Sequence, residues 1–253
     1  MENVWNFPPV EFVLQDTDVH VWRVRLDAVT LDAHRLRETL SEEELNRAQR
    51  FRFAKDRRQF LASRMALRRI LGQYLELEPS RLRFGYNPFG KPGLDSGCGD
   101  GSIFFNLSHS YGLALYAITR RREVGVDLER IRFDLSYEQL AEQFFSRQEV
   151  AALYACPASQ RYSTFFSCWT RKEAYVKAKG LGLSIPLDEF SVSLQSGGPS
   201  PLLTHVGGPD EISRWSLQEL MPELGYIGAV AVEGQTWRLL LWQWPANEQA
   251  TDR

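Results

Sequence analysis

Residues 162–183, with the sequence YSTFFSCWTRKEAYVKAKGLGL, hold the side chains best suited to chemistry. Residues 162–179 contain no Gly or Pro, so the stretch predicts a helix that ends at Gly180. At about 100° per residue, Glu173 and Lys177 fall within the apolar stripe of the helix. Such charges need compensation, so they form either an ion pair at the edge of a buried face or part of an active site.

The opposite face of this helix is expected to meet solvent. It carries Thr170, Arg171, Ala174 and Ala178, while aromatic side chains gather on the stripe around Glu173. One helix does not distinguish between the two interpretations of the charged pair. A second carboxylate cluster elsewhere in the chain would favour the active site.

Residues 123–129, EVGVDLE, supply a second pair of carboxylates. Their alternation predicts a strand with one apolar face and one face that carries Gly125, Asp127 and Glu129. Alternate side chains on a strand lie about 6.5 to 7 Å apart, so the two acids share a face, and Gly125 is expected to leave room for a ligand. The other interpretation is an exposed edge strand whose acids face water.

The three acids, Asp127, Glu129 and Glu173, have no His or Cys partners, so the expected metal is a hard cation, with Mg²⁺ the best fit. Residues 47–69 contain nine Lys or Arg against one acid. They form either a solvated helical face or a cationic wall for a phosphorylated ligand, on which Arg47 and Arg64 are the first candidates.

Composition restricts the class of protein. The chain has 253 residues, of which 43% are hydrophobic, and a net charge of −2, which gives no overall bias toward nucleic acid or membrane. Three scattered cysteines without metal-ligand spacing indicate a reducing compartment. No leader-like start and no apolar run of about 18 residues are visible, so we expect a cytoplasmic protein that does not enter membranes.

Local signals define the remaining elements. Two capping boxes begin helices, one with Ser41 and Glu44 and one with Ser146 and Glu149, so Glu149 is expected to be structural. A long amphipathic helix is expected over residues 55–75. Strands are expected over residues 19–26 (edge or half-buried), 82–86, 104–119, 123–129 and 186–194, with a closing hairpin formed by residues 226–233 and 236–244.

The order of elements repeats. A capping-box helix, a long helix and a short strand after a proline occur in residues 41–84 and again in residues 146–192. We therefore expect an α+β fold made of two similar subdomains about a pseudo-two-fold axis, with the active site in the cleft between them. The division is placed after Arg120, giving subdomains 1–120 and 121–253.

Four segments together resemble the 4'-phosphopantetheinyl transferases of the Sfp type. They are FGKPGL (89–94), FNLSHS (105–110), GVDLE (125–129) and FFSCWTRKEAYVKAKGLGL (165–183), within a resemblance that spans residues 47–192. Membership would imply a two-lobed monomer that uses Mg²⁺ and coenzyme A. The enzyme would transfer the 4'-phosphopantetheine arm to a serine of an apo acyl, polyketide or peptidyl carrier protein and release adenosine 3',5'-bisphosphate.

The resemblance also implies roles for individual residues. Asp127, Glu129 and Glu173 would surround Mg²⁺, with Glu173 and Lys177 catalytic and Lys177 also near the pyrophosphate of coenzyme A. The nucleotide and its 3'-phosphate would be contacted in subdomain 1–120 by Arg47, Gly90, Lys91, Pro92, Ser108 and His109. Glu44 departs from the pattern because relatives often place a basic residue there, so Arg50 or Arg58 could share the role of Arg47.

Two other functions are compatible with these residues. The chain could be a non-catalytic module that binds carrier proteins or nucleotides, or a Mg²⁺-dependent phosphohydrolase of coenzyme A. An increase in the mass of an apo carrier protein by one phosphopantetheine group would distinguish the transferase from both. The sequence does not indicate which carrier protein the enzyme would modify.

Overall fold

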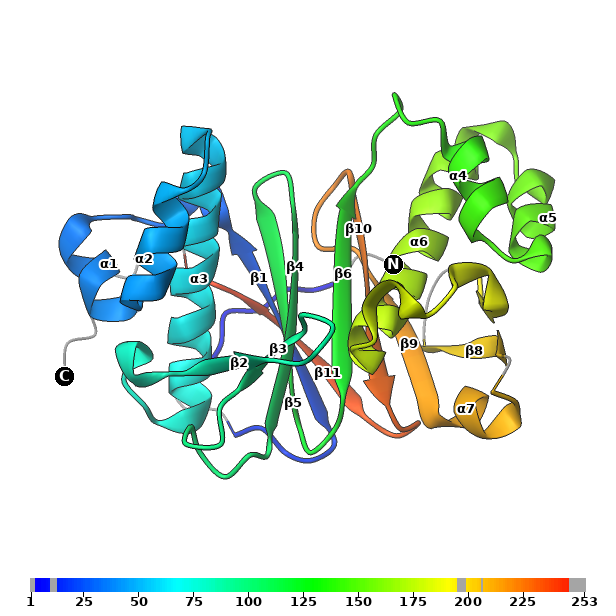
Figure 1. The fold of residues 1–253 in the computed structure, drawn as a ribbon. Helices are drawn as coiled ribbons and strands as arrows, with labels where there is room; N and C mark the ends of the chain where they lie inside the picture. Colours follow the sequence, from blue (N-terminus) through cyan, green and yellow to red (C-terminus); the bar gives the residue numbers. More distant parts are fainter. Residues whose placement is uncertain (1–2, 10–12, 195–198, 206, 246–253) are drawn as a thin grey trace.

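Two β-sheets stand side by side in the centre of the molecule, and a long helix covers the outer face of each (Figure 1). The computed structural model describes residues 3–9, 13–194, 199–205 and 207–245, so the start of the first expected subdomain and the end of the second lie outside the described residues. The helices are α1 (Ala33–Thr39), α2 (Glu42–Gln49), α3 (Ala54–Leu75), α4 (Tyr137–Phe144), α5 (Arg147–Ala155), α6 (Arg161–Lys179) and α7 (Pro209–Arg214).

The strands form three sheets. They are β1 (Asp18–Arg25), β2 (Phe84–Tyr86), β3 (Pro92–Leu94), β4 (Ile103–Ser110), β5 (Leu113–Arg120), β6 (Val124–Arg130), β7 (Phe190–Val192), β8 (Pro199–His205), β9 (Trp215–Leu220), β10 (Tyr226–Glu233) and β11 (Arg238–Gln243). The first sheet has the order β11-β1-β5-β4, the second has the order β6-β10-β9-β8-β7, and β2 pairs with β3. The expected α+β class is confirmed.

Three layers of apolar side chains hold the sheets and helices together. Alternate residues of the inner strands, such as Val21, Val126 and Val230, form a core between the two sheets. The other face of the first sheet packs on α3, and that of the second packs on α6. Because both faces of β1 and β5 are covered, their side chains are buried almost without interruption.

Several expectations about strands are corrected by this arrangement. The first strand is not at an edge, because β1 lies between β5 and β11. The closing hairpin is wrong: β10 is paired with β6 and β9 on its two sides, so β11 crosses to the other sheet and runs parallel to β1. Residues 104–119 form two strands, separated by a turn at Tyr111 and Gly112, and the strand expected over residues 186–194 shortens to β7.

The expectation that this side of α6 faces solvent is also wrong. Thr170, Arg171, Ala174 and Ala178 are all fully buried, because this side packs on β6 and β10. Between Phe165 and Ala178, the partly exposed residues are Trp169, Glu173 and Lys177, which all lie on the stripe. This middle part of the helix is therefore covered by protein on its other sides.

Both predicted capping boxes are confirmed, and each capping glutamate also binds a cation on the long helix of its half. Glu44 contacts Arg64 and Arg68 of α3, with Arg68 Nε 2.7 Å from Glu44 Oε2. Glu149 contacts the fully buried Lys172 of α6 at 2.8 Å. The repeat in the sequence therefore corresponds to a repeated structural unit, and the expected structural role of Glu149 fits this arrangement.

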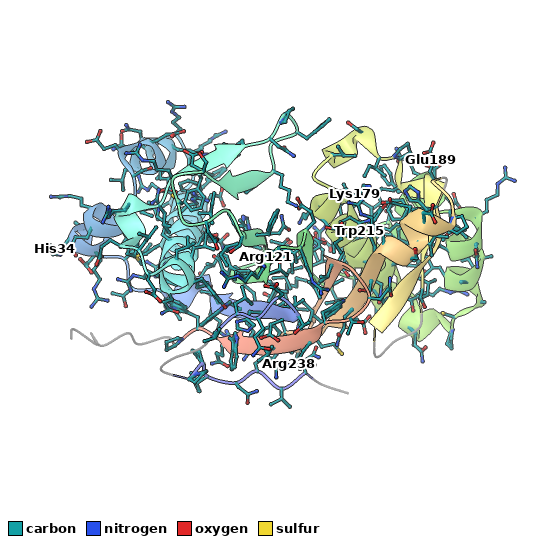
Figure 2. All side chains as sticks on the ribbon, turned by 90° about the horizontal axis from the view of Figure 1, so that it is seen from below. His34, Arg121, Lys179, Glu189, Trp215 and Arg238 are labelled. Carbon is teal, nitrogen blue, oxygen red and sulfur yellow. The ribbon has the colours of Figure 1, made fainter. Side chains whose placement is uncertain are left out.

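The last turn of α6 is fixed by a second cluster. Lys179 Nζ lies 2.7 Å from Glu211 Oε1 of α7 and above the ring of Trp215, which also donates to Glu211 (Figure 2). Tyr175 donates to the same carboxylate at 2.8 Å. These contacts hold the C-terminal end of α6 against β9. No helix in the described part of the chain combines the length and apolar character needed to cross a bilayer.

Replacement of Gly125 by alanine should destabilise the protein by about 3 kcal/mol or more, as severe overpacking does. A Cβ at this position would lie 2.0 Å from the carbonyl oxygen of Ala174 and 2.3 Å from the amide nitrogen of Ala178, so α6 would have to move as a whole. Urea denaturation checks this. Gly97→Ala is the control, because its Cβ would meet nothing within 4 Å; equal stability of the two variants would contradict the close packing of β6 on α6.

Candidate functional site

The two acids of β6 lie where the two sheets meet. β6 is the edge strand of the second sheet and runs beside β4, the edge strand of the first (Figure 1). The apolar residues of β6 enter the core between the sheets, while Gly125 and Asp127 face α6. Asp127 is only 4% exposed, whereas Glu129, nearer the end of the strand, is partly exposed.

Side chains of β4 connect the two edge strands. The amide of Val126 donates to Asn106 Oδ1 at 2.9 Å, Ser108 Oγ donates to Asp127 Oδ1 at 2.9 Å, and Ser110 Oγ donates to Glu129 Oε2 at 3.0 Å. We call this β4–β6 contact the seam. The alternation of β4 thus places three polar side chains on the face that meets β6.

Helix α6 brings a cation to the seam. Lys177 Nζ lies 2.6 Å from Asp127 Oδ1 and 3.1 Å from Ser108 Oγ. The close contact between α6 and β6 depends on Gly125, whose missing side chain leaves space for the backbone of the helix. The expectation that this glycine leaves room for a ligand is wrong, because the helix fills the space.

The carboxylates of the site influence each other. Burial and then the charge of Asp127 raise the pKa of Glu173, and the Lys177 ammonium opposes them. Burial and Asp127 likewise raise the pKa of Glu129, against the hydrogen bond from Ser110. The negative charge of Asp127 therefore raises the pKa of both glutamates, which places all three acids in one electrostatic environment.

The donor set can be tested for a metal on this geometry. Among the described residues, no three His, Cys, Asp or Glu side chains stand close enough together to form a metal site as they are. Asp127 Oδ2, however, is buried and receives no hydrogen bond from the described part of the chain. A buried carboxylate oxygen without a donor is suited to a cation, and Mg²⁺ in proteins often takes only one or two carboxylates. The residues therefore fit Mg²⁺.

The loop over residues 87–93 packs against the end of α6. Lys91 Nζ donates to the carbonyl of Ala178 at 2.8 Å and lies 2.6 Å from Glu123 Oε2, while Asn87 Nδ2 donates to the carbonyl of Gly180. Gly90 has a φ of 86° in the turn of the loop, and Pro92 begins β3. Lys91 thus binds the negative end of the helix.

The basic residues of the first half line a pocket of about 260 Å³ between α2, α3 and β2. Arg47 lies in its wall, with its guanidinium 5.3 Å from the centre of the Phe60 ring. Arg64 is bound to Glu44, and Arg58 donates to the backbone carbonyls before α1. The expected cationic wall is therefore partly neutralised, and among the described residues Arg47 and Arg50 form no ion pair with an acid.

His109 is exposed on β4, next to Ser108. Partial burial of its ring and the nearby Lys177 ammonium lower its pKa. The structure therefore brings together Ser108, Asp127, Lys177, Glu129 and Glu173, with His109 at their edge, whereas Lys91 is held at the end of α6 and Arg47 lies at the pocket beside α3.

Ser110 and Asn106 were not predicted as site residues. The signal was present: they lie two residues on either side of Ser108 in FNLSHS, so strand alternation puts all three on one face. Strand alternation also places Glu123 on the side of Asp127 and Glu129, but its contact with Lys91 had no sequence signal, because Lys91 lies on a loop distant in the chain.

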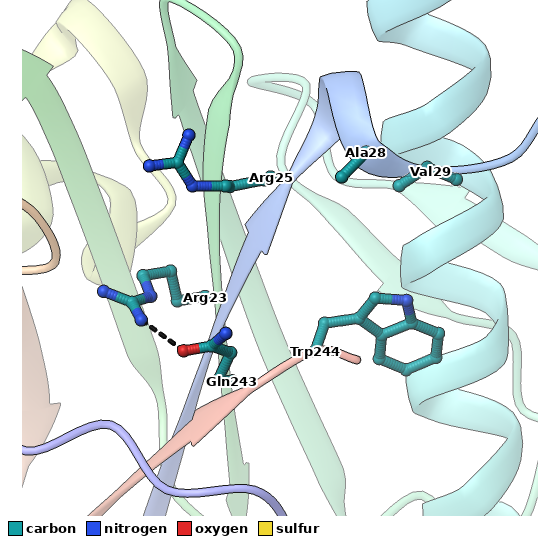
Figure 3. Close-up of a pocket in the computed structure, with 6 residues that line it drawn as sticks. All are labelled: Arg23, Arg25, Ala28, Val29, Gln243 and Trp244. Atoms are coloured by element: carbon teal, nitrogen blue, oxygen red, sulfur yellow. Dashed lines mark hydrogen bonds between the residues drawn. The ribbon is translucent and has the colours of Figure 1, made fainter. Parts of the chain in front are cut away.

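A smaller cavity of about 50 Å³ is lined by the C-terminal ends of β1 and β11 and by the segment that follows β1 (Figure 3). It is lined by two arginines, but Arg23 already donates to Gln243 Oε1 and to the carbonyl of Pro222, and Arg25 is paired with Glu223. This cavity is too small for a nucleotide.

Comparison with known proteins identifies the family. The model of the 4'-phosphopantetheinyl transferase superfamily matches residues 123–231, and that of the 4'-phosphopantetheinyl transferase N-terminal region matches residues 29–120. The 4'-phosphopantetheinyl transferase HetI of Nostoc sp. is 39% identical over 244 residues, which cover 96% of this chain and 100% of HetI. The chain therefore belongs to the 4'-phosphopantetheinyl transferase superfamily.

More distant relatives agree. The 4'-phosphopantetheinyl transferase Sfp of Bacillus subtilis is 31% identical over 159 residues, 63% of this chain and 68% of Sfp. The 4'-phosphopantetheinyl transferase gsp of Aneurinibacillus migulanus is 35% identical over 156 residues, 61% of this chain and 62% of the relative. The family resemblance inferred from the four sequence segments is confirmed.

Proposed function

We propose that this protein transfers the 4'-phosphopantetheine arm of coenzyme A to a serine of an apo acyl, polyketide or peptidyl carrier protein and releases adenosine 3',5'-bisphosphate. The observation that carries the proposal is the buried Asp127, with Lys177 on one oxygen and no donor from the described residues on the other. A phosphorylated substrate and a hard cation suit such a site. Membership in the family gives the reaction its class.

Asp127, Glu129 and Glu173 are the residues that we propose hold Mg²⁺. Their support is the shared electrostatic environment and the donor-free oxygen of Asp127. A bound Mg²⁺ would supply positive charge next to the pyrophosphate of coenzyme A. Lys177 is proposed to stabilise the departing adenosine bisphosphate through its ammonium group.

Glu173 is proposed as the group that accepts the proton of the carrier serine. Burial and the charge of Asp127 raise its pKa, and it is the carboxylate that α6 contributes to the site. It lies on the partly exposed stripe of α6, so a substrate can approach it. The serine oxygen then attacks the phosphorus that bears the pantetheine arm, and the bond from that phosphorus to the bisphosphate breaks.

The nucleotide of coenzyme A is proposed to lie against the first half of the chain. Residues proposed to contact it are Arg47, Gly90, Lys91, Pro92, Ser108 and His109. The pocket beside α3 supports the assignment of Arg47. Ser108 and Lys91 have protein partners in this structure, so their contact with coenzyme A requires them to exchange Asp127 and Glu123 for phosphate oxygens.

We also propose subdomains over residues 1–120 and 121–253, a division supported by the limits of the two matching family models. The last strand, β11, nevertheless completes the first sheet. The protein is proposed to act as a monomer. It is also proposed to lie in the cytoplasm, because its three free cysteines suit a reducing compartment.

The reaction can be tested directly by incubating the protein with coenzyme A, Mg²⁺ and an apo carrier protein. Mass spectrometry of the carrier should show the addition of one phosphopantetheine group, and adenosine bisphosphate should appear in equal amount. Free bisphosphate with an unmodified carrier would indicate a phosphohydrolase instead. Neither product would indicate a binding module.

Glu173→Gln should lower the rate of transfer by about 10² to 10⁴-fold, because the amide cannot accept the proton. The fold should be retained, since the side chain lies on the open stripe of α6. Single-turnover rates from the mass assay check this. Glu142→Gln, on the exposed face of α4, should transfer normally; if Glu173→Gln does so too, the carboxylate is not the base.

Asp127→Ala should shift the Mg²⁺ dependence of transfer to at least tenfold higher concentration. The change removes the one buried carboxylate of the site, and with it the oxygen that lacks a donor. Rates are measured across a Mg²⁺ titration, with Asp188→Ala as an exposed control. A titration curve that overlays that of the parent protein would exclude Asp127 as a ligand.

A further inference from the structure

The hydroxyl group of Ser110 has a fixed orientation. Its oxygen accepts the backbone N–H of Arg130 at 3.2 Å, and it donates to Glu129 Oε2 at 3.0 Å. A serine hydroxyl has a single hydrogen, so that hydrogen is committed to the carboxylate while a lone pair is committed to the amide. Ser110 itself is 8% exposed and cannot turn freely.

Glu129 depends on this contact for its conformation. Within the described part of the chain, Ser110 is the side chain that donates a hydrogen bond to Glu129. Glutamate has three rotatable bonds, so an unsupported carboxylate near the end of β6 would sample several positions. The hydrogen bond selects one of them.

Each of the two serines of the seam donates a hydrogen bond to one acid of β6. Ser108 binds one oxygen of Asp127 and Ser110 binds one oxygen of Glu129, in each case across the β4–β6 contact. Each acid keeps its second oxygen, Oδ2 of Asp127 and Oε1 of Glu129, without a donor from the described residues. The spacing of the serines therefore matches the spacing of the acids.

We propose that Ser110 is a positioning residue that holds Glu129 ready to share a divalent cation with Asp127. This inference rests on the proposed function, because it assumes that the acids bind a metal. Partners that orient a metal ligand typically contribute 10 to 100-fold to metal affinity. Ser110 touches neither coenzyme A nor the carrier in this role, and it acts through Glu129.

The test measures Mn²⁺ binding by electron paramagnetic resonance, with no coenzyme A or carrier protein present. Ser110→Ala should bind Mn²⁺ about 10 to 100-fold more weakly than the parent protein. Ser110→Thr keeps a hydroxyl and should bind nearly as the parent does. Ser110→Cys, whose thiol is a weak donor, should fall between them and provides a second variant if alanine prevents folding.

Ser216→Ala is the matched control. Ser216 is also buried, donates to the carbonyl of Gly234 and accepts from Trp237 Nε1, so its loss costs the same kinds of hydrogen bond without a carboxylate. Its Mn²⁺ affinity should equal that of the parent protein even if its thermal stability falls as far as that of Ser110→Ala.

Equal Mn²⁺ affinity in the parent protein and in the alanine and cysteine variants would overturn the role of Ser110 and leave the proposed transfer intact. Absence of Mn²⁺ binding by the parent protein would overturn both the cation site and the role of Ser110. The carrier mass assay reports on transfer separately, so the failure of one proposal is distinguishable from the failure of the other.

Discussion

The contact between β4 and β6 is the constraint on which the site depends. Two sheet edges meet there, and side chains of Asn106, Ser108 and Ser110 provide the hydrogen bonds. Edge strands normally expose unpaired backbone groups, and here Asn106 and Ser110 of β4 accept the backbone N–H groups of Val126 and Arg130 on β6. Because the polar side chains of β4 are needed to join the sheets, the same residues that stabilise the structure also orient the acids.

The long helices are anchored by a second kind of interaction that recurs in both halves. Glu44 and Glu149 each cap a short helix and bind a cation on the following long helix. Buried ion pairs gain little net stability, but removal of one partner leaves a buried charge and is costly. The pairs therefore fix the position of α3 and α6 relative to the caps. For α6, this sets where Glu173 and Lys177 lie.

Features that depend on residues close together in the sequence, such as helices and their caps, were predicted correctly. The long helix expected over residues 55–75 is observed as α3, and both capping boxes are confirmed, because capping and helix propensity act within a few residues. The hairpin of β10 and β11 was wrong because strand pairing is decided by the whole sheet, in which both sides of β10 were already taken. The buried face of α6 was missed because Arg171 is compensated by Glu219, a residue far along the chain.

The charge balance at Asp127 links the site to its proposed substrate. A buried carboxylate is stable in its ionised form only beside positive charge, and Lys177 provides that charge in this structure at 2.6 Å. Lys177 can therefore move to a phosphate oxygen without cost to Asp127 only when another cation takes its place. The acid and the lysine form one unit, whose total charge must stay balanced whether the site is free or holds its ligands. A lysine placed on an apolar stripe one turn beyond Glu173 meets this requirement, because its flexible stem can reach both partners.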